Sequence, residues 1–232
     1  MINPENKKVL YFDLDETLFF VEQFGEQGLK RASDSAQEDV SVSGPGVVGG
    51  ERGVVLERTR SGTLCGAQRV RAFALEEFRK IFQRIDAINR AAGETVIFLR
   101  FLTNASYTKN EILSVFWSLY GMPLRLDGFQ NRFRFSDKTV FRPPPKGYSM
   151  LDDFDQEYQR LGISKKKIYL IDDSYENCQM ASELGFNVIC MQTNPKTRRA
   201  GETYTQNKTL IFKTLNEILD EVDSSLQDCQ TN

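Results

Sequence analysis

The chain has 232 residues, of which 40% are hydrophobic and 27% charged, as in an ordinary globular protein with a buried core. The formal net charge of -2 gives no bulk attraction to nucleic acid or to an anionic membrane, and no apolar run reaches the ~20 residues that cross a bilayer. The sequence contains no histidine, which excludes Ser-His-Asp and Cys-His catalysis and any histidine-ligated zinc site. A metal ion would therefore be held mainly by oxygen, as Mg²⁺ prefers.

The cysteines give no sign of a metal site. Cys65, Cys178, Cys190 and Cys229 are scattered without metal-ligand spacing, so we expect free thiols in a reducing compartment. The first eight residues lead into a predicted strand and do not resemble a signal peptide. We therefore expect a cytoplasmic protein.

The first third of the chain combines one clear strand with a poorly patterned segment. Residues 8–14 form a short apolar run of strand length. Residues 22–53 are rich in Gly, Ser and charge, which predicts mainly loop. Residues 54–72 hold two mixed runs around a Ser-Gly pair, which favours a β-hairpin.

From residue 74 onward, predicted helices and strands alternate. Apolar residues recur at steps of three and four up to Gly93, and a near-continuous apolar run over 95–102 is typical of a strand covered on both faces. Further helices are predicted at 108–120, 149–161, 174–184 and 215–226, and further strands at 167–171, 187–191 and 209–212. This alternation indicates an α/β fold, with a parallel sheet flanked by helices in a single domain over residues 1–232.

A basic and aromatic segment lies between residues 124 and 146, with six Lys or Arg residues. Alternation over Arg132–Phe135 favours a solvated hairpin at the edge of a sheet. The alternative is a basic surface for a phosphorylated protein, a phosphoinositide or another anionic ligand.

Polar side chains follow several predicted strands at the point where each strand ends. They are Asp13 and Asp15 after the first strand, Thr103 and Asn104 after the next, and Asp172 and Asp173 after the strand at 167–171, with Lys146 in a loop before a helix. Ligands of open α/β sheets bind beyond the carboxyl ends of the strands, so we expect these side chains to share one edge. Paired carboxylates there can attack, move a proton and hold a divalent cation.

These residues resemble the motifs of the haloacid dehalogenase (HAD) superfamily of phosphatases. Residues 12–17, Phe-Asp-Leu-Asp-Glu-Thr, match its first motif in full. Residues 102–104 look like the second motif, Lys146 is a candidate for the third, and residues 171–173 look like the fourth. The similarity spans about residues 8–191. It implies a Rossmann-like core, Mg²⁺-dependent phosphoryl transfer and a small cap inserted at residues 19–73.

The resemblance also implies a role for each residue. Asp13 would attack phosphorus and form an aspartyl-phosphate, while Asp15 would protonate the leaving oxygen and later activate water. The Thr103 hydroxyl and the Lys146 ammonium would bind the transferring phosphoryl oxygens, with the backbone N–H of Asn104 as a further donor.

The implied Mg²⁺ would have ligands from the first and the fourth motif. They would be Asp13, the backbone carbonyl of Asp15, and one or both of Asp172 and Asp173. Such a metal ion would let an anionic nucleophile approach an anionic phosphate.

The substrate is less well determined than the reaction. A small, loop-rich cap favours a phosphoprotein, with phosphotyrosine as one form, and a small phosphorylated metabolite is the close alternative. Phosphotransfer to an acceptor other than water and a catalytically inactive binding module with the same fold also remain. Because some intracellular bacterial pathogens secrete HAD-like effectors, the cytosol of a host cell is the alternative location.

Overall fold

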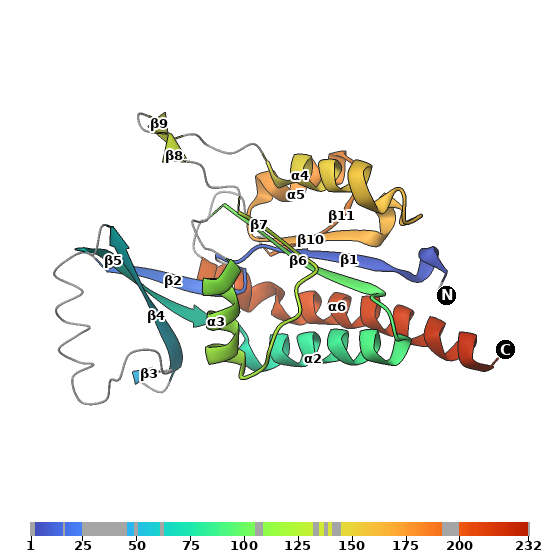
Figure 1. Cartoon of the computed structure of the whole chain (residues 1–232), viewed down its shortest axis with the longest axis horizontal. Helices are drawn as coiled ribbons and strands as arrows, with labels where there is room; N and C mark the ends of the chain where they lie inside the picture. The colour runs from blue at the N-terminus through green and yellow to red at the C-terminus, as the bar shows by residue number, and fades with distance from the viewer. Residues whose placement is uncertain are drawn as a thin grey trace.

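The computed structural model describes residues 3–15, 17–24, 46–48, 51–60, 63–104, 109–131, 135–136, 139–140, 145–191 and 200–231. Its centre is a five-stranded sheet in the order β11-β10-β1-β6-β7, with every neighbouring pair parallel (Figure 1). The strands are β1 (Lys8–Phe12), β6 (Ile97–Thr103), β7 (Gly128–Asn131), β10 (Ile168–Asp172) and β11 (Asn187–Cys190).

Helices cover both faces of this sheet (Figure 1). One face carries α4 (Lys146–Asp153), its π-helical continuation η2 (Phe154–Tyr158) and α5 (Tyr175–Glu183), and the other carries α2 (Leu75–Ala92), α3 (Lys109–Tyr120) and α6 (Ala200–Thr231). Short 3-10 turns lie at η1 (Pro4–Asn6) and η3 (Lys165–Lys167). Within the described residues, no helix is both long and apolar enough to cross a membrane. The predicted Rossmann-like α/β fold class is confirmed.

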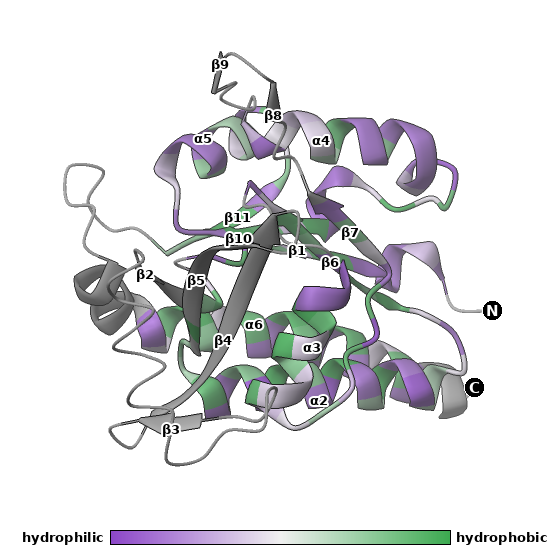
Figure 2. Ribbon diagram, turned by 60° about the vertical axis from the view of Figure 1, so that its left-hand side comes forward, coloured by the Kyte–Doolittle hydropathy of each residue, from purple (hydrophilic) through white to green (hydrophobic). Residues whose placement is uncertain are grey.

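The alternation of side chains along β1 explains why this strand is apolar throughout. Leu10 and Phe12 face the core formed with α2, α3 and α6, whereas Val9 and Tyr11 belong to the core under α4 and α5. All four are buried, so neither face of the strand can be polar. Phe12 packs edge-on against Phe82 of α2 with 5.7 Å between ring centroids. Figure 2 shows the same pattern, with hydrophobic residues gathered between the layers.

A second sheet is inserted between β1 and α2. It is antiparallel, with the strand order β2-β5-β4-β3. The strands are β2 (Phe19–Phe24), β3 (Gly46–Val48), β4 (Glu51–Arg60) and β5 (Thr63–Ala72). The hairpin predicted over 54–72 is confirmed.

The loop predicted over residues 22–53 is wrong at both of its ends. The strand β2 continues to Phe24, and β3 and β4 occupy residues 46–48 and 51–53, where Gly46 pairs with Gly53. Pairing with a neighbouring strand overrides a glycine-rich composition, because it satisfies the backbone hydrogen bonds that a lone segment would leave to water. Residues 25–45 lie outside the described part of the chain.

The strand predicted at 209–212 is also wrong, because α6 runs through it as one helix. Ile211, Leu215, Leu219 and Val222 are buried at spacings of three and four, which continues the period of a helix packed on the core. The β-branched residues near 209 indicated a strand locally, and burial of the helical stripe against the core overrides that preference.

The region around residues 124–146 differs from its prediction in two ways. The strand β7 was not anticipated and forms an edge of the parallel sheet, followed by a small hairpin of β8 (Phe135–Ser136) and β9 (Thr139–Val140). Lys146 is the first residue of α4, whereas a loop position and a helix start at 149 were predicted. Residues 132–134 and Arg142, on which the basic-surface alternative depends, lie outside the described residues.

A polar network ties α4 to the sheet through Asp153. Its Oδ2 accepts hydrogen bonds from the Tyr11 hydroxyl at 2.6 Å and from Arg100 Nη1 at 2.9 Å, and its Oδ1 accepts one from Gln130 Nε2 at 2.8 Å. These partners lie on β1, β6 and β7, so a single carboxylate joins three strands to the helix that begins with Lys146.

We expect Asp153→Ala to lower the free energy of unfolding by about 2–3 kcal/mol, because the mostly buried Arg100 loses one of its two carboxylate partners and keeps only Glu157. Tyr11→Phe removes only one hydrogen bond and is expected to cost about 1 kcal/mol. Urea denaturation followed by circular dichroism measures both. Equal losses for the two variants would show that the network contributes no more than a single hydrogen bond.

Candidate active site

The first and fourth motifs meet where the strand order reverses. Within the parallel sheet, β6 pairs with β1 on one side, and β10, which comes later in the chain, pairs with β1 on the other side. Ligand sites of open α/β sheets lie at such switch points, beyond the carboxyl ends of the strands. Asp13 directly follows β1, and its N–H donates to the carbonyl of Ile171 at 2.9 Å, which places it beside the end of β10 at Asp172.

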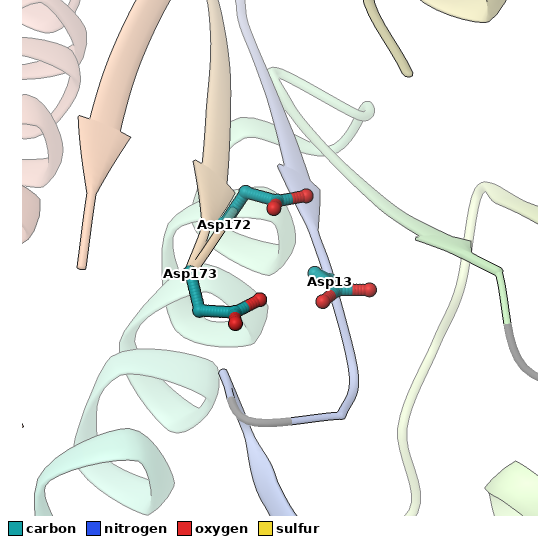
Figure 3. A group of neighbouring side chains, drawn as sticks. All are labelled: Asp13, Asp172 and Asp173. Carbon is teal, nitrogen blue, oxygen red and sulfur yellow. The ribbon is translucent and has the colours of Figure 1, made fainter. Parts of the chain in front are cut away.

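Three carboxylates gather at this position. One carboxylate oxygen from each of Asp13, Asp172 and Asp173 lies within 4.8 Å of the other two (Figure 3). Asp13 is 6% exposed, Asp172 is fully buried and Asp173 is half-buried. A compact set of carboxylate oxygens is the donor chemistry that Mg²⁺ prefers, so these residues fit the implied metal ion.

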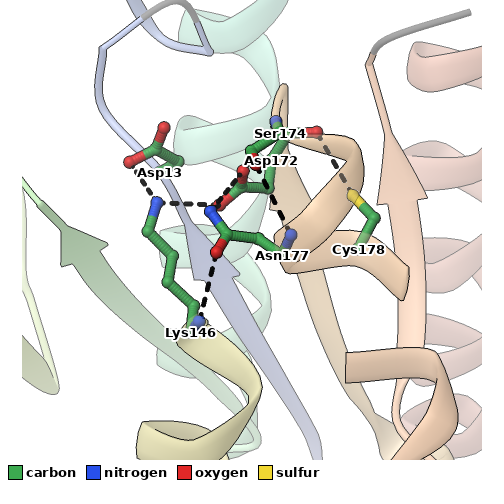
Figure 4. Close-up of polar contacts among 6 residues, drawn as sticks. All are labelled: Asp13, Lys146, Asp172, Ser174, Asn177 and Cys178. Atoms are coloured by element: carbon green, nitrogen blue, oxygen red, sulfur yellow. Dashed lines mark hydrogen bonds and ion pairs between the residues drawn. The ribbon is translucent and has the colours of Figure 1, made fainter. Parts of the chain in front are cut away.

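Lys146 reaches the same point from α4, on one face of the sheet. Its Nζ lies 2.7 Å from Asp172 Oδ2 and also forms an ion pair with Asp13 Oδ1 (Figure 4). The side chain is 1% exposed, so both ion pairs are shielded from water. The lysine therefore bridges the ends of β1 and β10.

The electrostatics of the cluster leave an excess of negative charge. Burial raises the pKa of Asp13 well above its usual value, the Lys146 ammonium opposes this, and the Asp172 and Asp173 carboxylates add to it. Burial alone would lower the pKa of Lys146, but the ion pairs with Asp13 and Asp172 outweigh it and raise that pKa above its ordinary value. One ammonium cannot balance three carboxylates, so the site favours an added cation.

The buried Asp172 carboxylate has further hydrogen-bond donors around it. Its Oδ1 accepts from the backbone N–H of Ser174 at 2.8 Å, and Asn177 Nδ2 donates to its two oxygens at 3.1 and 3.3 Å (Figure 4). Asn177 was missed in the sequence. It stands three residues after Ser174, the N-cap of α5, but the pattern gives no sign that its amide faces Asp172.

The other predicted residues lie at the same edge of the sheet. Thr103 is the last residue of β6 and is buried, and Asn104 follows it on the surface. Asp15 is half-buried, and its backbone forms an isolated bridge with Phe19. The strand β1 ends at Phe12, so strand alternation does not by itself orient Asp13 and Asp15. Among the described residues, the carboxylate cluster contains Asp13, Asp172 and Asp173 but not the side chain of Asp15.

Comparison with known proteins gives structural likenesses at low sequence identity. No protein-family model and no curated protein matches the sequence. The HAD domain of the effector protein Lem4 from Legionella pneumophila is 11% identical, with 88% of this chain and 94% of that chain covered and a TM-score of 0.41. CbbY from Rhodobacter sphaeroides, in complex with phosphate, is 14% identical, with 83% and 89% covered and a TM-score of 0.36.

A HAD family enzyme, bt-2542 from Bacteroides thetaiotaomicron, was solved with magnesium and inorganic phosphate. It is 14% identical, with 84% of this chain and 98% of that chain covered and a TM-score of 0.37. At such values these likenesses do not decide what this chain does, and the functional assignment depends on the motif residues and their geometry.

Proposed function

We infer that this chain is a member of the HAD superfamily and a Mg²⁺-dependent phosphatase that hydrolyses a phosphate monoester. One observation carries the proposal: Asp13, Lys146, Asp172 and Asp173, which match three separate motifs, form one mostly buried cluster at the switch point of the sheet. A chance gathering of such residues is hard to reconcile with the cost of burying several carboxylates and an ammonium together.

The reaction would proceed in two displacements on phosphorus. An Asp13 carboxylate oxygen forms a bond to phosphorus while the bond to the leaving oxygen breaks, and protonated Asp15 gives its proton to that oxygen. Asp15 then accepts a proton from a water molecule, whose oxygen attacks phosphorus and displaces Asp13 as a free carboxylate. Inorganic phosphate is released and both aspartates return to their starting states.

Lys146 would act on both partners of the first displacement. Its ammonium lowers the pKa of Asp13 and so favours the ionised nucleophile. The same ammonium, with the Thr103 hydroxyl and the Asn104 backbone N–H, would hold the phosphoryl oxygens, where charge is spread in the transition state.

Mg²⁺ would be held by Asp13, Asp172, Asp173 and the backbone carbonyl of Asp15. When bound, it supplies positive charge that reduces the repulsion between the carboxylate nucleophile and the phosphate. The protein's part is to hold three carboxylates close together in a mostly buried position.

The direct test is hydrolysis of para-nitrophenyl phosphate by the purified full chain. We expect turnover with Mg²⁺, loss of turnover with EDTA, and recovery when Mg²⁺ is added back, because the carboxylates would otherwise repel the substrate. Phosphate release measured over a panel of phosphoesters extends the assay. If the folded protein hydrolyses none of them, the non-catalytic binding module becomes the better reading.

For the substrate, we propose that the β2–β5 sheet is the cap and that a phosphoprotein is hydrolysed. The sheet starts next to the first motif, where Phe19 bridges Asp15 and is buried in the main core with Val70. The preference for a phosphoprotein substrate assumed a loop-rich insertion, whereas much of 19–72 is strand. A cap built of strands equally suits a small phosphorylated metabolite, which is the second candidate.

A panel of phosphopeptides and phosphorylated metabolites separates these two substrates. We expect kcat/KM to be higher for phosphotyrosine, phosphoserine or phosphothreonine peptides than for sugar and nucleoside phosphates. The reverse order would assign the enzyme to metabolite hydrolysis and leave the reaction class unchanged.

A further inference from the structure

Asn177 connects two site residues that come from different elements, Lys146 at the start of α4 and Asp172 at the end of β10. It lies in the first turn of α5 and is 7% exposed. Its Oδ1 accepts a hydrogen bond from the backbone N–H of Lys146 at 3.2 Å, and its Nδ2 donates to both oxygens of Asp172 (Figure 4). The acceptor and the donor of one amide are thus used on two different site residues.

The contact with Lys146 caps helix α4 from outside. The first N–H groups of a helix lack partners within it, and the N-cap Pro145 provides no side-chain hydrogen bond. The Asn177 oxygen satisfies one of these groups from a neighbouring helix. This fixes the backbone from which the Lys146 side chain extends to Asp13 and Asp172.

The two helices are also unusually close at Gly147. A Cβ added there would lie 3.0 Å from the backbone nitrogen of Ala181 and 3.1 Å from Met180 Cγ. A larger residue would therefore push α4 away from α5. The absence of a side chain at 147 allows the Asn177 amide to reach the start of α4.

The contact with Asp172 completes the set of hydrogen-bond donors around that carboxylate. Its Oδ1 also accepts from the Ser174 N–H, and its Oδ2 is paired with Lys146 Nζ. Because Asn177 Nδ2 donates to both oxygens, each oxygen of Asp172 has two hydrogen-bond donors. The carboxylate plane cannot turn without losing a buried hydrogen bond.

We propose that Asn177 is a positioning residue, which holds Lys146 and Asp172 in a fixed relation so that both face Asp13. The proposal rests on the phosphatase function proposed above and adds a residue outside the predicted site. An amide suits this position because it has an acceptor for the N–H and a donor for the carboxylate. Aspartate would place a second anion against Asp172, and leucine would provide neither group.

The test compares Asn177→Leu and Asn177→Asp with Gln179→Glu and Gln179→Leu. Gln179 is an exposed amide on the same helix, and its Nε2 donates to Glu183 Oε1 at 2.9 Å, so its variants make the same chemical changes away from the site. Asn177→Ser serves if the first two variants do not fold. Thermal unfolding, kcat and KM on the aryl phosphate, and Mg²⁺ affinity by calorimetry are measured for each.

We expect kcat at saturating Mg²⁺ to fall about 10- to 100-fold in both Asn177 variants, as is found when residues behind metal ligands are changed. The Mg²⁺ dissociation constant of Asn177→Leu should rise about 10-fold, because Asp172 loses its orientation. The Gln179 variants should keep wild-type values. Folded Asn177 variants with wild-type kcat and Mg²⁺ affinity would overturn the proposal.

Calorimetry also separates this proposal from the phosphatase assignment. If the wild-type protein hydrolyses no phosphoester but binds Mg²⁺ at least 10-fold more tightly than Asn177→Leu, the phosphatase function fails and the positioning role stands. Equal Mg²⁺ affinity, or no Mg²⁺ binding by either protein, overturns the positioning role.

Discussion

Asp13→Asn is expected to abolish phosphoester turnover, lowering kcat by at least about 1,000-fold. The amide is nearly the same size as the carboxylate, but it cannot attack phosphorus or form the acyl-phosphate bond. Steady-state hydrolysis of para-nitrophenyl phosphate with Mg²⁺ measures the loss. A competent nucleophile elsewhere in the site would leave activity largely intact.

The fold should survive this substitution, which makes the result interpretable. Burial beside Asp172 and Asp173 disfavours the charge of Asp13, and Lys146 retains its ion pair with Asp172. We therefore expect urea denaturation to show no loss of stability. Asp152→Asn makes the same change at an exposed position in α4 and should leave both activity and stability unchanged. Turnover by folded Asp13→Asn at the wild-type rate would mean that another group attacks.

Lys146→Met should lower kcat by about 100- to 1,000-fold, the usual cost of losing one donor to transition-state charge. It also leaves Asp13 and Asp172 buried without their cation, so the free energy of unfolding should fall by about 3–5 kcal/mol without Mg²⁺. Added Mg²⁺ should recover more stability in this variant than in the wild type. Denaturation with and without Mg²⁺ measures the difference.

The pH dependence of Lys146→Met has a definite direction. The ammonium lowers the pKa of Asp13, so its removal raises that pKa. Because Asp13 must be ionised to attack, the acidic limb of the kcat/KM profile should move to higher pH. Lys166→Met, at an exposed lysine in η3, is the matched control and should keep the wild-type profile. An unchanged pH profile in Lys146→Met would show that Lys146 does not control the ionisation of the nucleophile.

The sequence predicted well wherever a local pattern determines the structure. The apolar runs over 8–14 and 167–171 favour buried strands, and polar residues after parallel strands meet at one edge by the geometry of the sheet. The cluster of Asp13, Asp172 and Asp173 follows from these two facts. Lys146 pairs with Asp13 and Asp172, although it begins a helix where the sequence predicts a loop.

The features that were missed depend on contacts between distant segments. Asn177 has an ordinary helical environment in the sequence, and its role is visible only once α4 lies against α5 at Gly147. The strand β3 forms because it pairs with β4, and the glycine-rich sequence of this segment gives no sign of that pairing. The strand predicted at 209–212 is wrong because tertiary packing overrides the local pattern. Burial of the apolar stripe that includes Ile211 favours one long helix.

The position of β1 in the sheet has a consequence for how the protein is made. This strand precedes the other four strands of the sheet in the chain, yet it lies in the middle, and its partner β10 is among the last strands of the sheet to emerge from the ribosome. Until then one edge of β1 has no strand to pair with, and Asp13 lacks Asp172, Asp173 and the neighbouring end of β10. Parallel pairing over such a separation in the chain forms slowly. The nascent chain therefore cannot assemble its carboxylate cluster early, and the proposed metal site is complete only in molecules whose synthesis has passed residue 173.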